Sequence, residues 1–293
     1  MKSLLRGAVL AGAGLAGYGY LEHLWYRLVT REVPVFGPRP ELSILHVADT
    51  HMAPRHRRMR RFLESLPERI GAVPDLVVLT GDVISGNDAI EDAVAALGPL
   101  PARYGKLYVL GSHDYFLPRF EGYLKYFSGR KEKIRAPRAD TARLEGLLRE
   151  HGWKGVINSS ARVETPAGPV RVTGVADPYL GWHKTEHIKR EPDDLFAIGL
   201  VHSPDVVSPF LLEGFDLVLA GHTHGGQVRA PLIGALVTNS SLPTALAAGL
   251  HRIGNGWLFV SPGLGTGKYA PLRLNCRPEV TLLRLVSRVG DHQ

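Results

Sequence analysis

Five short apolar runs in the chain each end at a residue that can bind a metal ion. The runs are rich in Val, Leu and Ile and cover residues 42–48, 76–80, 107–110, 195–201 and 215–220. Runs of this length, bounded by Gly or Asp, predict buried strands. Because ligands gather at the carboxyl ends of strands in α/β sheets, we expect the side chains that follow the five runs to meet at one edge of a sheet.

Helical patterns fit between these runs. Apolar residues recur at helical spacing within 57–70, and segments 89–97 and 142–151 also suit helices. Further β-type runs appear later in the chain, at 170–175, 257–260 and 280–285. Helices alternate with strands in the first half and strands dominate the second, which predicts two packed mixed sheets flanked by helices.

The polar residues at the ends of the five runs form a set suited to metal chemistry. They belong to the motifs Asp-x-His, Gly-Asp, Gly-x-His-Asp, a lone His and Gly-His-Thr-His, and are Asp49, His51, Asp82, His113, Asp114, His202, His222 and His224. Carboxylate and imidazole together suit Mn, Fe or Zn, whereas thiolates favour zinc or iron–sulfur sites. The single cysteine, Cys276, lies far from these motifs in the sequence. Two ions about 3.5–4 Å apart can clamp a phosphoryl group and activate a water molecule.

Taken alone, each motif has a simpler interpretation. A single histidine at a strand end, such as His202, is more often structural than a ligand, and Asp82 after Gly81 fits a turn or a helix cap. His222 and His224 are two residues apart, which places them on one side of an extended segment. The five motifs in order, each behind an apolar run, favour a metal centre.

The ordered motifs resemble those of the calcineurin-like metallophosphoesterases. The resemblance covers residues 42–286, and the stretch 260–265 is similar to the membrane-anchored bacterial branch of that family. It implies an α/β fold, a four-layer αββα sandwich of two mixed sheets, with the catalytic domain at 40–287. It also implies a dinuclear metal-dependent phosphoric ester hydrolase with two divalent ions, Mn, Fe or Zn. The bond cleaved would be a phosphodiester, pyrophosphate or phosphomonoester, in a lipid-linked or nucleotide-linked substrate.

The resemblance also implies roles for individual residues. The first ion would be held by Asp49, His51 and His224. His202 and His222 would hold the second ion, and Asp82 would bridge the two. His113 would lie beside the scissile phosphate, with Asp114 orienting it through a hydrogen bond. The attacking group would be a metal-activated hydroxide, so no covalent nucleophile from the protein is required.

One position departs from the family pattern. The family has Asn before the His of the third motif, and its side-chain carbonyl binds the second ion, whereas this chain has Ser112. A neutral hydroxyl is shorter and a poorer ligand, so we expect the second ion to be held more weakly. The alternative to an enzyme is therefore a catalytically weak or silent binding protein that retains the fold.

The amino-terminal segment carries no charge between Arg6 and Glu22 and is rich in Ala, Gly and Leu. This run is shorter than the roughly 20 residues that span a bilayer, although Arg6 snorkelling and the aromatic residues at 25–26 can extend it. Without a convincing cleavage site after it, an anchor over residues 1–30 is favoured over a cleaved signal peptide. Because Lys2 and Arg6 precede it, we expect a cell-membrane protein with its catalytic domain outside the cytoplasm.

The net charge is +7, and its main source is the basic run 55–61, just after the first motif. Such a run can attract an anionic substrate or lipid headgroups, and a solvated helix face explains it equally well. No nucleic-acid-binding motif accompanies it, so a nuclease is a minor alternative and nucleic acid is not an expected partner. A length of 293 residues suits one large domain.

Overall fold

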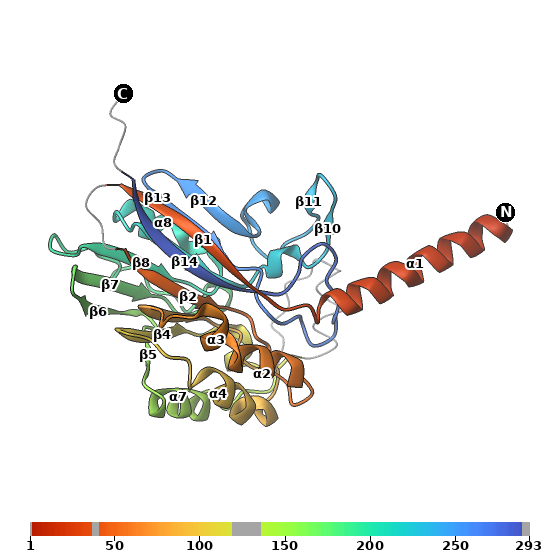
Figure 1. The fold of residues 1–293 in the computed structure, drawn as a ribbon, viewed down its shortest axis with the longest axis horizontal. Helices are drawn as coiled ribbons and strands as arrows, with labels where there is room; N and C mark the ends of the chain where they lie inside the picture. The colour runs from red at the N-terminus through yellow and green to blue at the C-terminus, as the bar shows by residue number, and fades with distance from the viewer. Residues whose placement is uncertain (1, 37–40, 119–135, 289–293) are drawn as a thin grey trace.

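Two six-stranded mixed sheets pack face to face in the computed structural model, which describes residues 2–36, 41–118 and 136–288 (Figure 1). The first sheet has the order β1 (Arg27–Phe36), β14 (Glu279–Arg288), β2 (Ser43–Val47), β3 (Leu76–Thr80), β4 (Gly105–Val109), β5 (Trp153–Gly155). The second has the order β12 (Gly249–Ile253), β13 (Gly256–Val260), β9 (Leu217–Ala220), β8 (Phe196–Leu200), β7 (Gly168–Gly174), β6 (Ser159–Thr165). The predicted α/β architecture with two mixed sheets is confirmed.

Helices cover the outer faces of both sheets. The first sheet is covered by α2 (Arg57–Glu64), α3 (Leu66–Ile70), α4 (Ile90–Leu97) and α7 (Thr141–Glu150), and the second by α8 (Val207–Leu212) (Figure 1). Short 3-10 turns lie between these elements: η1 (Asn87–Ala89), η2 (Pro178–Leu180), η3 (Pro204–Val206), η4 (His224–Gly226) and η5 (Thr244–Leu246). A separate hairpin joins β10 (Arg229–Ala230) to β11 (Gly234–Ala235).

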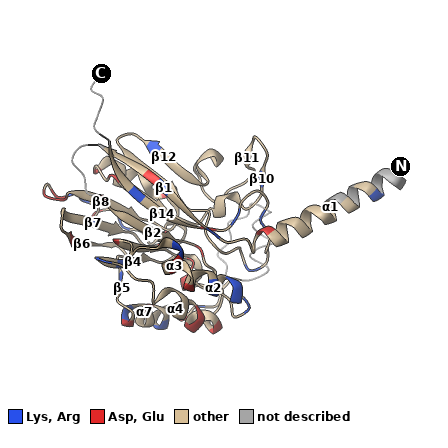
Figure 2. Ribbon diagram, in the orientation of Figure 1, with Lys and Arg blue, Asp and Glu red and all other residues tan. Residues whose placement is uncertain are grey.

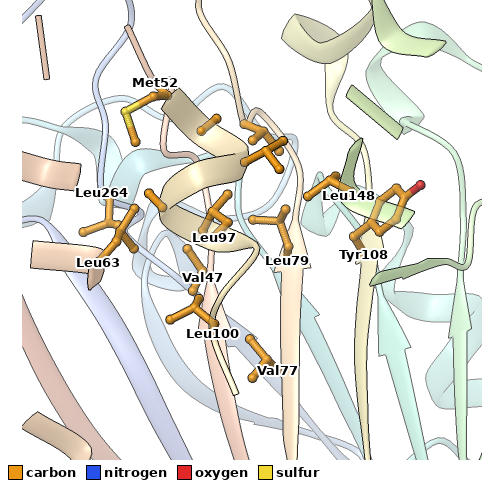
Figure 3. Packing of buried hydrophobic residues seen from close by; sticks show 14 of the residues in the cluster. Val47, Met52, Leu63, Val77, Leu79, Leu97, Leu100, Tyr108, Leu148 and Leu264 are labelled. Carbon is orange, nitrogen blue, oxygen red and sulfur yellow. The ribbon is translucent and has the colours of Figure 1, made fainter. Parts of the chain in front are cut away.

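The apolar runs become strands because both faces of each central strand are covered. One cluster lies between the sheets and includes Ile44 and Val78 of the first sheet with Ile198 and Leu219 of the second. A second cluster packs the other face of the first sheet against its helices, as Figure 3 shows for Leu79 among others. Continuous apolar runs are typical of parallel strands buried on both faces, which explains why these strands could be located from sequence.

The sheets include more of the chain than the expected domain. β1 lies upstream of residue 40 and pairs in parallel with β14 along its whole length, from Arg27 opposite Glu279 to Phe36 opposite Arg288. The sequence does not predict this strand because Arg31 and Glu32 interrupt its apolar residues and Pro34 lies within it, which an edge strand tolerates.

The amino-terminal helix α1 (Lys2–Glu22) projects away from the sheets (Figure 1). Its last turn is attached to the domain, because the Glu22 carboxylate accepts hydrogen bonds from the backbone N–H groups of Asn275 (2.9 Å) and Cys276 (2.7 Å). No helix within the described ranges is long and apolar enough to cross a membrane. The expected membrane-spanning anchor is therefore not supported, since glycine and tyrosine dilute the apolar residues of this segment.

The basic run 55–61 leads into α2, which is partly blue in Figure 2, and its arginines are exposed. Arg60 of this run is paired with Glu64 and with Asp92, each at 2.9 Å. Exposed pairs of this kind contribute little to stability, and they offset part of the positive charge that the sequence places here.

A buried arginine fixes the loop that follows β13. Arg273 is fully buried, and its guanidinium donates hydrogen bonds to the backbone carbonyls of Pro262 (2.7 Å), Gly263 (3.1 Å) and Gly265 (2.5 Å). The N–H of Gly265 in turn donates to the carbonyl of Asp49 (2.6 Å). This loop therefore braces the backbone that carries the first predicted metal ligand.

His46 on β2 is a buried histidine outside the predicted site. Its Nε2 lies 2.8 Å from Thr80 Oγ1, and its ring contacts Phe259 edge-on with centroids 5.6 Å apart. Burial lowers the pKa of His46 to about 3, so the ring stays neutral in the folded protein.

We expect His46→Gln to reduce the dependence of stability on pH. An unfolded histidine binds a proton near pH 6.5, whereas folded His46 does so only near pH 3. The wild type therefore loses unfolding free energy as the pH falls from 6.5 towards 3, by about 1.4 kcal/mol per pH unit within that window. Glutamine keeps a polar partner for Thr80 and does not titrate. Urea unfolding of both metal-free proteins at pH 7 and pH 5 measures this, and a pH-independent difference between them would contradict it.

Candidate metal centre

The carboxyl ends of the central strands bring the predicted ligands to one edge of the paired sheets. Asp49 and Asp82 each follow their strands, β2 and β3, by two residues, and these strands are parallel neighbours. In the second sheet, His202 and His222 likewise follow the parallel strands β8 and β9 by two residues. His113 lies on the short helix α5 (Ser112–Tyr115), just beyond β4.

Asp82 lies at the centre of the cluster. Its Oδ2 is 3.4 Å from His202 Nε2, 3.5 Å from His51 Nε2 and 4.0 Å from His113 Nε2. The ligand atoms of Asp49, His51 and His224 lie within 4.8 Å of one another, as do those of Asp49, Asp82 and His202. An oxygen placed between two groups of imidazoles has the position that a bridging carboxylate requires.

Hydrogen bonds to the far ring nitrogens leave the near ones free to bind a metal. His202 Nδ1 lies 2.8 Å from the carbonyl of Thr80, which can only accept, so Nδ1 carries the proton and Nε2 faces Asp82. His222 Nε2 lies 3.0 Å from the carbonyl of Asn239, which leaves Nδ1 facing His202 Nε2 at 3.3 Å. Such contacts orient metal-binding imidazoles.

The two sheets are tied together at this site. The backbone N–H of His222 donates to both carboxylate oxygens of Asp49 at 3.0 Å, so a group from β9 fixes the ligand that follows β2. A Cβ on Gly221 would lie only 2.4 Å from Asp49 Oδ2, and one on Gly111 only 2.3 Å from Asp82 Oδ1. The glycines of these motifs are therefore required by close packing.

The ligand residues have an unusual backbone. Five of the six predicted ligands have positive φ angles: Asp49 (48°), His51 (41°), Asp82 (51°), His222 (72°) and His224 (50°). This left-handed conformation is uncommon outside glycine and costs on the order of 1–3 kcal/mol for each residue. Strain of this kind clusters at functional sites, but nothing in the sequence pattern indicates it.

Burial keeps most of the imidazoles neutral. It lowers the pKa of His51 to about 3 and that of His222 to about 4, and it lowers the pKa of His224 well below its ordinary value. Burial, with a smaller contribution from the nearby Asp82, also raises the pKa of Asp49 to about 7. For Asp82 burial acts in the same direction, but the neighbouring histidines, His202 first, hold its pKa well below the ordinary value.

The donor set fits divalent cations. Neutral imidazoles present lone pairs, and the two carboxylates at the centre, Asp49 and Asp82, form no ion pair with lysine or arginine among the described residues. A cation bound here would compensate buried negative charge and use every inward-facing nitrogen. His224 Nδ1 has no hydrogen-bond partner among the described residues, while its Nε2 lies 3.2 Å from His51 Nε2.

Asp114 does not have the role expected from the sequence. Its carboxylate accepts hydrogen bonds from the backbone N–H groups of Val83 (2.7 Å), Ile84 (3.2 Å) and Gly111 (3.0 Å), and not from His113. The expected His113–Asp114 hydrogen bond was wrong because a side chain at the start of a helix turns back to nearby backbone donors. Asp114 instead holds the turn that carries Asp82, and burial raises its pKa to about 7.

His113 faces the mouth of the cluster. Its side chain is 32% exposed, and its ring contacts that of His51 edge-on at 5.0 Å. Its backbone N–H donates to Asp82 Oδ1 at 2.9 Å, which helps to fix the central carboxylate. Ser112, the residue that departs from the family pattern, is the first residue of the same helix.

Aromatic side chains border the cluster. Trp182 packs edge-on against Tyr115 with centroids 5.0 Å apart, and the largely exposed Tyr179 lies 6.0 Å from the ring of His222. Both come from the segment after β7, which also supplies the buried carboxylate of Asp177. The sequence reasoning identified the strand at 170–175 but missed Asp177, although it follows this strand as the other candidates follow theirs.

The chain is similar to known proteins along most of its length. A family model described as calcineurin-like phosphoesterase matches residues 42–226. The uncharacterized metallophosphoesterase YkuE of Bacillus subtilis is 29% identical over 96% of this chain and 94% of its own length. The phosphodiesterase YaeI of Escherichia coli is 26% identical over 97% of this chain and 98% of its own length. A transmembrane protein with metallophosphoesterase domain from Danio rerio is 27% identical over 94% of this chain and 61% of its own length.

Proposed function

Because this chain belongs to the calcineurin-like phosphoesterase family, we propose that it is a dinuclear metal-dependent hydrolase that cleaves a phosphodiester bond. The observation that carries the proposal is the position of Asp82 Oδ2, 3.5 Å from His51 Nε2 and 3.4 Å from His202 Nε2. The family and the similarity to a relative named as a phosphodiesterase support the reaction class.

The six ligands divide into two groups around Asp82. One ion would be held by Asp49, His51 and His224, and the other by His202 and His222, with Asp82 between them. When bound, such a pair of Mn, Fe or Zn ions supplies an activated water and stabilises charge on the phosphoryl oxygens. Pyrophosphate and phosphomonoester bonds make the same demands on a site, and they are the alternative substrates.

Side chains and backbone groups of the protein position the metal ligands and supply a proton to the leaving oxygen. His113 reaches the mouth of the cluster, where its imidazole can donate a proton to the leaving oxygen or stabilise its charge. Asp114 and the backbone N–H of His113 keep the Asp82 turn in place from two sides. Asp49 is fixed by the backbone N–H of His222. No side chain is needed as a covalent nucleophile.

An amphipathic substrate is the finer part of the proposal. The β10–β11 hairpin begins just after His224–Gly226 and carries Leu232, which is fully exposed, and Ile233, which is 75% exposed. Exposed apolar side chains next to a site indicate a binding surface. We propose that they contact an apolar portion of the substrate, as a lipid-linked phosphodiester would provide.

Removal of metal should abolish hydrolysis of an aryl phosphodiester, and Mn, Fe or Zn should restore it.

We expect Asp82→Asn to lower kcat/KM by at least about 100-fold. Even the loss of a residue that only orients a ligand lowers metal affinity or activity by about 10- to 100-fold in such sites. The control Asp193→Asn removes an exposed carboxylate before β8, far from the ligands, and should leave activity unchanged. If neither the wild type nor Ser112→Asn hydrolyses diesters or monoesters with any of these metals, the protein is the silent binding protein.

His113→Asn should lower kcat while leaving the bound metal content unchanged. General acid catalysis contributes about 10²- to 10⁴-fold, mostly where the leaving group is a poor one. We therefore expect a larger loss for an alkyl phosphodiester than for the p-nitrophenyl diester, whose leaving group needs no proton. Steady-state kinetics on both substrates measure this. Equal losses on the two would mean that His113 does not protonate the leaving group.

Leu232→Ser combined with Ile233→Ser should lower kcat/KM for a long-chain acyl phosphodiester and spare a short-chain one. Each buried methylene is worth about 0.8 kcal/mol, so the long-to-short ratio should fall several-fold. Leu212→Ser is the matched control, because this leucine is 87% exposed on α8. A ratio that is unchanged by the double variant, or that falls equally in Leu212→Ser, would exclude the hairpin from substrate binding.

A further inference from the structure

A carboxylate outside the predicted ligand set lies beside the second-ion half of the centre. β7 and β8 are parallel neighbours with Gly174 opposite Leu200, and Val175 still donates to the carbonyl of Leu200. Asp177 lies three residues beyond Gly174 on one strand, and His202 lies two residues beyond Leu200 on its neighbour. The two side chains therefore leave adjacent strands at the same edge, and Asp177 lies within electrostatic range of both His202 and Asp82.

One oxygen of this carboxylate has no partner. Asp177 is fully buried; its Oδ1 accepts a hydrogen bond from Tyr179 N at 2.9 Å, while Oδ2 has no hydrogen-bond partner among the described residues. Leaving a buried carboxylate oxygen unpaired is costly. Among the residues that the structure describes, the other buried carboxylate with an unpartnered oxygen is Asp194, and it is neutralised by Arg171. A ligand of positive charge would satisfy Asp177 in the same way.

The segment that holds Asp177 is firmly built. Asn158 accepts hydrogen bonds from the backbone N–H groups of Ala176 and Lys184, each at 2.9 Å, and donates to the carbonyl of Trp182 at 3.0 Å. These contacts fix both ends of the segment, so the position of Asp177 is set by its surroundings.

The same segment packs against the helix that begins with Ser112. Trp182 contacts the ring of Tyr115, the last residue of α5, and the carboxylate of Asp177 is within electrostatic range of His113 on that helix. Ser112 stands where a better ligand for the second ion would be expected, and the carboxylate of Asp177 lies within electrostatic range of His202, a predicted ligand of that ion.

We propose that Asp177 is an additional acidic residue of the second divalent-cation position and compensates for the weak ligand Ser112. Asp177 is absent from the groups whose ligand atoms lie within 4.8 Å of one another, so it would act on the cation as a nearby negative acceptor and not as a direct ligand. The proposal rests on the proposed function, because it assumes that the cluster binds two cations.

Direct measurement of metal binding tests this independently of turnover. Titration of chelator-treated wild type with Mn²⁺, followed by calorimetry and by elemental analysis, should show two ions per chain. Asp177→Asn should bind the first ion with unchanged affinity and the second about 10- to 100-fold more weakly, as is typical for loss of a group that orients metal ligands. Asp193→Asn, which removes an exposed carboxylate, should bind both ions as the wild type does.

Ser112 provides the second arm of the experiment. Ser112→Asn alone should tighten the second site, and adding Asp177→Asn to it should cost less than Asp177→Asn costs in the wild type. Coupling of this kind is expected only if both residues act on one cation. Additive effects would mean that Asp177 does not compensate for Ser112, and would overturn that part of the proposal.

A separate control tests whether the Asp177 variant folds. Asparagine at position 177 retains the oxygen that accepts the hydrogen bond from Tyr179 N. The unfolding temperature in the presence of chelator shows whether the Asp177→Asn protein is folded. If it is not folded, Asp177→Ser, whose hydroxyl can also cap this turn, takes its place in the metal titration. An unchanged second-ion affinity, or a loss confined to the first ion, would overturn the proposal and leave the phosphodiesterase function standing. Absence of any Mn²⁺ binding by the wild type would overturn both.

Discussion

The candidate site depends on one constraint: the carboxyl ends of parallel strands from the two sheets lie close together. Neither sheet alone carries a complete set of donors. The link between Asp49 and the backbone of His222 fixes their alignment, and Gly221 and Gly111 allow the distance because a side chain at either position would collide with a ligand. The apolar layer between the sheets supplies the force that holds this arrangement, since it buries large aliphatic side chains from both.

This arrangement places several ionisable side chains close together in a buried position. Buried carboxylates face imidazoles that burial keeps largely neutral. His202 is the exception, because the neighbouring Asp82 outweighs the effect of burial and raises its pKa well above the ordinary value. Metal binding and folding are coupled under these conditions, because cations that bind only the folded chain stabilise it. Arg273 strengthens the surrounding framework through carbonyl groups and leaves the carboxylates of Asp49 and Asp82 available.

The sequence predicted the parts of the structure that follow from local pattern. The central strands were located because they are apolar on both faces, and the residues at their ends were identified because parallel strands share one edge. Contacts set by three-dimensional packing were beyond its reach. Asp114 turned to the backbone of a neighbouring loop, and β1 became an edge strand because β14 returns to pair with it. Asp177 shows the same limit, since its importance arises from an unpaired oxygen that only coordinates reveal.

The left-handed backbone at the ligands also restricts which side chains could ever replace them. Aspartate and histidine are among the few residues other than glycine that tolerate this conformation with some frequency, so selection for donor chemistry and selection for chain geometry coincide at Asp49, His51, Asp82, His222 and His224. Valine or threonine at these turns would be penalised by the main chain before any question of coordination arose. Few side chains are therefore available for re-engineering the centre for a different metal, and asparagine is the most accessible addition.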